Sequence, residues 1–156
     1  MAPTDTVTVE RRVAASPATV YALVSDVTRM GEWSPETTSC RWLGGASRAA
    51  VGARFRGTNR SGRRQWSTTC TVVQADPATG FGFEVKAGPV AIARWTYDLR
   101  HDGDGCVVTE TWTDQRARWM TRAGTLLTGV ADRAEHNRRT MEQTLERLAS
   151  AAEAAG

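Results

Sequence analysis

Residues 118–154 read RWMTRAGTLLTGVADRAEHNRRTMEQTLERLASAAEA and contain no proline. Apolar residues recur in steps of three and four, which keeps them on one face of a helix while charged residues occupy the opposite face. The stripe consists of Trp119, Ala123, Leu127, Val130, Ala134, Met141, Leu145 and Leu148. The spacing predicts a long C-terminal helix, roughly 50 Å if it is continuous, and such a helix needs a large apolar surface to lie against.

Two features qualify this helix. Asn137 lies on the stripe where an apolar residue is expected, so a polar group is predicted to face the interior. Gly124 and Gly129 each weaken the helix by about 1 kcal/mol relative to alanine. We therefore expect a firm helix over residues 130–152 and a looser or bent segment over residues 119–128, which is the better candidate for gating a ligand.

The preceding residues predict a sheet. Segments in which apolar and polar residues alternate are separated by clusters of Gly, Pro, Asp and Asn, and they cover residues 6–13, 40–43, 54–59, 64–74, 81–86, 91–100 and 106–113. Ser16-Pro17 predicts the start of a short helix, and Asp26 the cap of a second one. The short connections favour an antiparallel meander. We therefore expect a single α+β domain over residues 1–156, with a curved seven-stranded antiparallel sheet wrapped around the C-terminal helix.

The inward faces of these strands combine large aromatic residues with a few polar ones, which is what a ligand pocket requires. Trp33, which follows the second short helix, is expected near the mouth of the cavity. A buried carboxylate is costly, so Glu110 must be paired, neutral or directed into a wet cavity. The predicted ligand-binding residues are Trp33, Phe55, Trp66, Thr68, Phe83, Trp95, Tyr97, Trp112, Leu127, Val130, Asn137 and Met141.

Charge and composition exclude other classes. The net charge is +3, and Lys86 is the only lysine among 20 basic residues. Five arginines gather around a predicted hairpin, most of them at outward positions: Arg54, Arg56, Arg60, Arg63 and Arg64. Because aromatic residues are not interleaved with them on one face, a solvated edge is favoured over a nucleic-acid site. No apolar run is long enough to span a membrane and the start has no signal-peptide core, so we expect a cytoplasmic protein without integral membrane association.

Cysteines and histidines give no sign of a metal or nucleophilic site. Cys40, Cys70 and Cys106 are widely spaced and lack histidines at ligand spacing, which predicts small buried thiols rather than disulfides or zinc ligands. His136 follows Asp132 by four residues, which favours an Asp–His pair on the helix surface. The sequence shows neither the residues of a hydrolase triad nor a glycine-rich phosphate loop. We therefore expect no metal and no cofactor.

Several segments carry a family resemblance. They are VAASPATVYALVSDVTRMGEWSPE (13–36), VGARFRGTNRSGRRQWST (51–68), ARWTYDL (93–99), VVTETW (107–112) and DRAEHNRRTMEQTLERL (132–148). Together with the order of elements, these segments resemble the helix-grip fold of the START-like (SRPBCC) superfamily, in its polyketide cyclase/dehydrase branch. The resemblance implies a cavity between the sheet and the last helix that suits a hydrophobic or amphipathic small molecule.

Two functions are consistent with this resemblance. The first is binding of a polyketide- or lipid-like molecule, as a monomer or a homodimer. The alternative is a polyketide cyclase/dehydrase that catalyses aldol cyclisation and water loss, with Glu110 as base and with Tyr97 and Asn59 holding an enolate or carbonyl oxygen. Each residue also has a structural interpretation: Glu110 paired with an arginine, Tyr97 as a core aromatic, and Asn59 stabilising a turn. A third possibility is a regulatory protein whose exposed helix face binds another protein.

Overall fold

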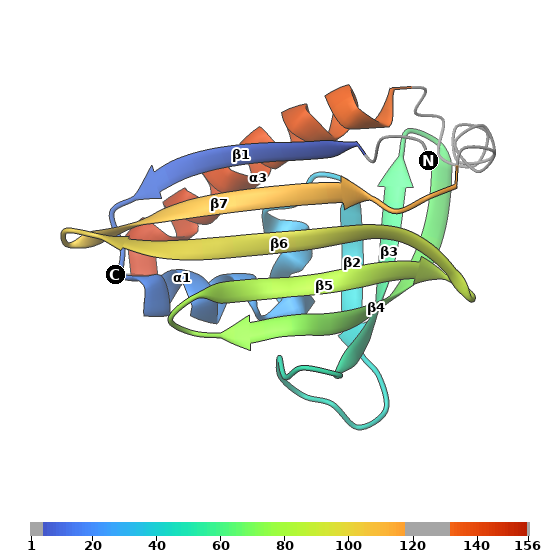
Figure 1. The fold of residues 1–156 in the computed structure, drawn as a ribbon, viewed down its shortest axis with the longest axis horizontal. Coiled ribbons are helices and arrows are strands. Elements are labelled where there is room, and N and C mark those ends of the chain that lie inside the picture. Colours follow the sequence, from blue (N-terminus) through green and yellow to red (C-terminus); the bar gives the residue numbers. More distant parts are fainter. Residues whose placement is uncertain (1–4, 118–131, 156) are drawn as a thin grey trace.

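The computed structural model describes residues 5–117 and 132–155, and its element order follows the prediction (Figure 1). The elements are β1 (Thr6–Val13), α1 (Pro17–Val24), the 3-10 helix η1 (Val27–Glu32), β2 (Thr37–Trp42), β3 (Arg54–Ser61), β4 (Arg64–Asp76), β5 (Gly80–Ala87), β6 (Val90–Asp102), β7 (Gly105–Asp114) and α3 (Arg133–Ala155). The strands form one antiparallel sheet in the order β1-β7-β6-β5-β4-β3-β2. This confirms the predicted α+β class and the seven-stranded sheet.

The two short helices begin where the sequence indicates. The backbone N–H of Thr19 donates to Oγ of Ser16 at 3.1 Å, and Pro17 occupies the first turn of α1, where its missing N–H costs nothing. The N–H of Thr28 donates to Asp26 at 3.2 Å and caps η1 in the same way. Both helices therefore start at side-chain caps that satisfy otherwise free backbone donors.

The sheet curves around α3. Every strand from β2 to β6 pairs with the next in the chain, while β1 pairs with β7, so the first and last strands lie side by side. In Figure 1, β2 and β3 run steeply across the direction of β1, β7 and β6. Helix α3 packs along β1 and also contacts α1 and β7. One side of the sheet is thereby enclosed, and the side chains that alternate toward it form the interior.

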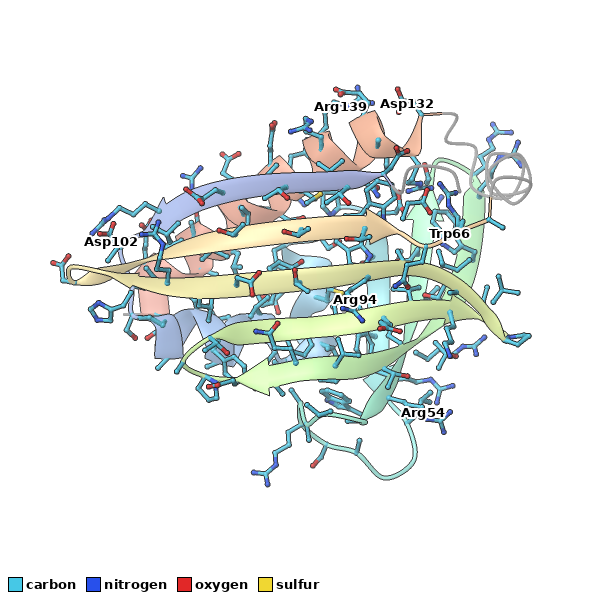
Figure 2. All side chains as sticks on the ribbon, in the orientation of Figure 1. Arg54, Trp66, Arg94, Asp102, Asp132 and Arg139 are labelled. Atoms are coloured by element: carbon cyan, nitrogen blue, oxygen red, sulfur yellow. The ribbon has the colours of Figure 1, made fainter. Side chains whose placement is uncertain are left out.

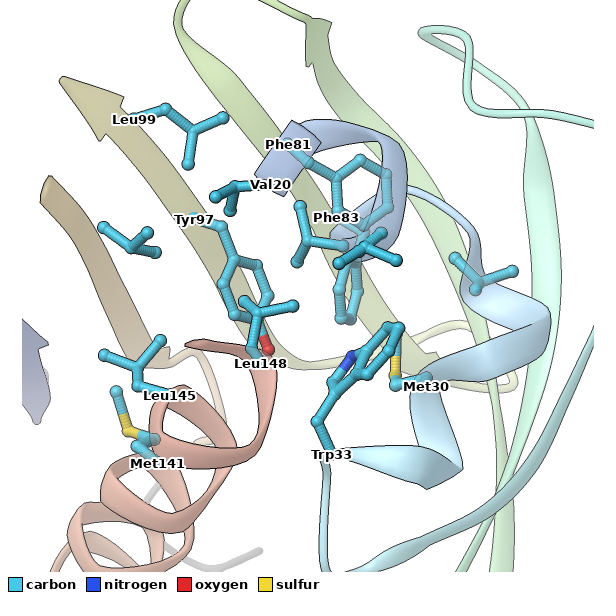
Figure 3. Packing of buried hydrophobic residues seen from close by; sticks show 14 of the residues in the cluster. Val20, Met30, Trp33, Phe81, Phe83, Tyr97, Leu99, Met141, Leu145 and Leu148 are labelled. Atoms are coloured by element: carbon cyan, nitrogen blue, oxygen red, sulfur yellow. The ribbon is translucent and has the colours of Figure 1, made fainter. Parts of the chain in front are cut away.

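Apolar side chains fill the part of this interior nearest α1. Figure 3 shows Leu145 and Leu148 of α3 facing Tyr97 of β6, with Val20 of α1 close by. Trp33 is also buried here, with only 1% of its surface exposed. Burial of aromatic and aliphatic surface on this scale is the main force that holds helix and sheet together.

The C-terminal helix begins later than expected. Asp132 is not helical, and α3 starts at Arg133 rather than near residue 130. Asp132 instead caps the helix, because its Oδ1 accepts the N–H of Glu135 at 3.1 Å and its carbonyl oxygen accepts that of His136 at 3.1 Å. The predicted helix over residues 118–154 is therefore not continuous. The predicted looser segment, with its two glycines, lies outside the described residues.

The arginine cluster lies on the outside. Arg54, Arg56, Arg60, Arg63 and Arg64 are all exposed around the β3–β4 hairpin. The strand phase predicts this for the three arginines of β3, whereas Arg64 is exposed although it shares the phase of Trp66. Among residues 5–117 and 132–155, no helix is long and apolar enough to cross a bilayer.

Candidate functional site

A cavity of about 200 Å³ lies between the inner face of the sheet and α3. Most of the predicted ligand-binding residues line it: Phe55, Trp66, Thr68, Phe83, Trp95, Tyr97, Trp112, Asn137 and Met141. Asn59 and Glu110 line it as well. Trp33 does not, because its ring is buried in the core rather than placed at the cavity mouth. Leu127 and Val130 lie outside the described residues.

The aromatic wall follows from strand register. Trp95 of β6 pairs with Trp112 of β7, and two residues further along the sheet Tyr97 pairs with Glu110. Alternate residues of a strand share a face, so all four side chains point to the same side. The rings of Trp95 and Trp112 lie 6.5 Å apart, centroid to centroid, and tilt by 47°. The result is an apolar wall that ends in a hydroxyl and a carboxyl group.

Glu110 is the most unusual group in this wall. Only 1% of its surface is exposed, and its Oε2 atom has no hydrogen-bond partner among the described residues. Burial raises the pKa of Glu110 to about 8, although hydrogen bonding with the Tyr97 side chain opposes the rise. Burial and the neighbouring Glu110 also raise the pKa of Tyr97 well above its ordinary value. Both groups are therefore mainly neutral at pH 7 in the ligand-free protein.

Among the described residues, no arginine forms an ion pair with Glu110. The two cavity-lining arginines pair with other carboxylates, Arg116 with Asp114 and Arg133 with Glu36. Arg116 donates from Nε and Nη2 to the two Asp114 oxygens at 2.9 and 2.8 Å. Glu110 is thus a buried acid without a counter-charge in the described chain.

Asn59 belongs to the other end of the cavity. Asn59 pairs with Trp66 on β4. Tyr97 of β6 pairs with Phe81 of β5, which in turn pairs with Ala75 of β4. Trp66 and Ala75 are nine residues apart on β4, so Asn59 and Tyr97 lie at different positions along the strands. Asn59 also accepts a 3.4 Å hydrogen bond from the Thr37 hydroxyl. The structure therefore brings Tyr97 and Glu110 together and leaves Asn59 at a distance from them.

A charged cluster joins the start of α3 to the segment before β2. Nη1 of Arg133 donates to both carboxylate oxygens of Glu36, at 2.9 and 3.0 Å, and to Oδ1 of Asn137 at 3.4 Å. His136 Nε2 lies 2.7 Å from the same Glu36 carboxylate. The predicted pairing of His136 with Asp132 is therefore wrong, because the imidazole turns toward Glu36 and Asp132 caps the helix.

Three residues of this cluster, Glu36, Arg133 and Asn137, also line the cavity. The Arg133 guanidinium lies 5.8 Å from the centre of the Trp66 ring, within range of a cation–π interaction. Figure 2 shows Trp66 and Asp132 at the same end of the molecule. Glu36, Arg116 and Arg133 also line the cavity, although the sequence pattern did not indicate them. The only local signal was the spacing of Asp114, the last residue of β7, and Arg116, two residues later.

The thiols contribute to the wall as small neutral groups. Cys40 and Cys70 line the cavity, and burial raises the pKa of their thiols to about 11 and about 12. Cys106 is buried elsewhere, and all three are free. In the described part of the chain, no three His, Cys, Asp or Glu side chains gather as metal ligands. The cavity is thus apolar along its walls and polar at two separate ends.

Comparison with known proteins supports the fold described above, an antiparallel sheet wrapped around a C-terminal helix. A family model described as polyketide cyclase/dehydrase and lipid transport matches residues 4–153. The Polyketide_cyc-like protein Cgl2372 from Corynebacterium glutamicum is 31% identical, with a TM-score of 0.58 over 98% of this chain and 91% of that one. No protein of curated function matches this sequence significantly.

Two more distant structures share the fold alone. The KanY protein (ms6282) is 19% identical, with a TM-score of 0.70 over 97% of this chain and 99% of that one. Ara h 8.0201 is 12% identical, with a TM-score of 0.67 over 96% and 98% of the two chains. The architecture is therefore retained at low sequence identity.

Proposed function

Because the chain belongs to the polyketide cyclase/dehydrase and lipid-transport family, we propose that it binds a hydrophobic or amphipathic small molecule of polyketide- or lipid-like character. The observation that carries this proposal is the cavity of about 200 Å³ between the sheet and α3, whose surface is mainly apolar. Apolar pockets with a few placed polar groups are typical of small-molecule sites.

The distribution of polarity suits an amphipathic ligand. Phe55, Phe83, Trp95 and Trp112 supply apolar contact along the walls, where burial contributes affinity in proportion to area. Polar groups stand at the two ends, Glu110 with Tyr97 at one and the Glu36 cluster at the other. Since the two cavity-lining arginines, Arg116 and Arg133, are already paired, the cavity does not require an anionic ligand to neutralise them.

Native mass spectrometry of protein purified from its own host tests the proposal. We expect a retained small molecule that is released on denaturation. The control is Gly57→Leu on β3, because an added Cβ would meet Cys40 Sγ at 3.6 Å and Thr68 Oγ1 at 3.8 Å, which are ordinary contacts, while the rest of the side chain fills the cavity. Uniformly empty wild-type protein, or equal retention by the folded variant, would contradict the proposal.

A second candidate is a cyclase/dehydrase activity, and the pairing of Glu110 with Tyr97 inside the cavity favours it. The raised pKa of Glu110, to about 8, suits a proton donor at neutral pH better than the base expected from the sequence. In a dehydration, Glu110 would protonate the leaving hydroxyl as the carbon–oxygen bond breaks, and water would depart. The carboxylate so formed would then accept the proton from the neighbouring carbon, which returns Glu110 to its neutral state.

Substitution Glu110→Gln separates the two functions. The amide keeps the shape of the side chain but cannot transfer a proton, so turnover of a candidate poly-β-ketone should fall by at least about a hundredfold if Glu110 is the acid. Retention of a host ligand should persist in this variant under the binding function. Unchanged turnover would rule out the enzyme proposal as written.

A further inference from the structure

The feature that the proposed function leaves unexplained is the chemistry of Glu110. This carboxyl group lines the cavity, one of its oxygens lacks a partner, and it has no counter-ion among the described residues. An unpaired buried polar atom costs on the order of 1–3 kcal/mol, so a ligand group that satisfies it recovers free energy that an apolar surface cannot.

The surroundings keep this acid neutral. Across the sheet it lies between Val9 of β1 and Tyr97 of β6. The cavity-lining residues of α3 that follow Arg133 and Asn137 are Thr140, Met141 and Thr144, none of which titrates near neutral pH. The other titratable groups that line the cavity are the neutral thiols Cys40 and Cys70, and Glu36, Arg116 and Arg133, which are engaged in ion pairs.

A neutral carboxylic acid can donate a hydrogen bond, which a carboxylate cannot do. We propose that Glu110 donates a hydrogen bond to the carbonyl oxygen of an uncharged ligand, and that Tyr97 is the positioning residue that holds the acid in place. This inference rests on the proposed ligand binding and assigns a ligand class to the inner end of the cavity. A charged carboxylate is disfavoured there, because no described cation is free to pair with it.

Four probes that share one aromatic ring test this assignment: acetophenone, α-methylstyrene, 1-phenylethylamine and benzoate. The first three carry branched substituents of similar size that end in a carbonyl oxygen, a methylene group or an ammonium group, so differences in affinity report on the polar contact. Dissociation constants come from NMR titration of the 17.0 kDa protein. We expect the ketone to bind about tenfold more tightly than the alkene at about pH 6.5, and benzoate to bind most weakly.

Variants of Glu110 and Tyr97 distinguish hydrogen-bond donation from the effect of side-chain shape. Glu110→Leu removes the donor, so the ketone-to-alkene affinity ratio should fall to about one. Glu110→Gln retains an N–H donor but does not titrate, so its preference for the ketone should be the same at about pH 6.5 and about pH 9.5, whereas the wild-type preference should disappear at the higher pH. Tyr97→Phe should weaken the ketone preference without abolishing its pH dependence.

Each alternative outcome has a distinct meaning. Equal binding of ketone and alkene to the wild-type protein would overturn the inference and leave ligand binding intact. Tighter binding of the amine than of the ketone would show that Glu110 binds a cation, which also overturns it. Failure of all four probes to bind at millimolar concentration, together with an empty host-purified protein, would contradict the proposed function itself.

Discussion

Arg133 and Glu36, which are 97 residues apart in the chain, form a charged hydrogen bond at the point where α3 meets the segment before β2. Only 13% of the Arg133 side chain and 19% of the Glu36 side chain are exposed. Partial burial strengthens such a pair and also makes the loss of one partner costly, because the other charge remains poorly solvated. The start of the helix is therefore attached to the sheet by a specific contact in addition to apolar packing.

Substitution Glu36→Gln should lower the free energy of unfolding by about 1–3 kcal/mol. The amide keeps the size of the side chain but removes the charge that both Arg133 and His136 face. Urea denaturation followed by tryptophan fluorescence measures this change. The control is Asp102→Asn, which breaks the exposed Arg12–Asp102 pair and should cost less than about 1 kcal/mol. Equal losses in the two variants would contradict a special role for the contacts of Glu36 with Arg133 and His136.

The cap of α3 gives a second prediction. Asp132 accepts the backbone N–H of Glu135, and its negative charge also stands at the positive end of the helix dipole. Asp132→Ala should therefore destabilise the protein by about 1 kcal/mol, and Asp132→Ser should recover most of the loss. Asp104→Ala, at an exposed turn, serves as the control in the same urea titrations. A cap that contributes nothing would make the alanine and serine variants indistinguishable.

Which side chains of a strand face inward was predictable, because it depends only on the local alternation of apolar and polar residues. Alternation alone indicated that Tyr97, Glu110 and Trp112 face inward, and all three are buried and line the cavity. Caps at Ser16 and Asp26 were equally visible, since a side chain that bonds a backbone group two or three residues away leaves its mark in the sequence.

The position of each inward-facing residue along the length of the cavity was not predictable in the same way. Phase assigns Asn59 and Glu110 to the same face but does not say that they lie toward opposite ends, because that depends on how seven strands are staggered and curved. The pairing of His136 with Glu36 spans 100 residues and arises only when the segment before β2 meets the helix. A local partner, Asp132, was the obvious choice from spacing, but the helix cap requires that carboxylate.

A close backbone approach beside Tyr97 gives a third prediction. Gly80 has φ of +144°, and a Cβ at this position would lie 2.1 Å from the Tyr97 carbonyl oxygen. Gly88 also has a positive φ, +59°, but a Cβ there would meet nothing within 4 Å. Gly88→Ala should therefore cost only about 1 kcal/mol from backbone strain.

Gly80→Ala carries the same kind of strain together with a backbone clash, so its loss of stability should exceed that of Gly88→Ala by at least about 2 kcal/mol. Thermal unfolding of the two variants measures the difference. Similar melting temperatures would mean that β5 and β6 separate locally at little cost, which would weaken the case for a rigidly positioned Tyr97.

The burial of Glu110 predicts a dependence of stability on pH. Its pKa is raised in the folded protein from an ordinary value of 4.5 to about 8, so the folded state retains the proton over a range in which the unfolded state has lost it. Stability rises with pH only where the unfolded state binds more protons, and here the folded state binds more. The contribution of Glu110 is therefore fully present below about pH 4.5, falls as the pH rises toward 8, and is constant above.

Comparison with Glu110→Gln isolates this contribution, because all other titrating groups are common to both proteins. The free energy of unfolding of the wild type, relative to the variant, should decrease by several kcal/mol between about pH 4.5 and about pH 8, since each unit of pKa shift corresponds to about 1.4 kcal/mol. Denaturation in urea at a series of pH values gives both curves. A difference that stays constant over this range would mean that water or a local rearrangement solvates the carboxylate, and Glu110 would then be unable to act as the neutral donor that the ligand site requires.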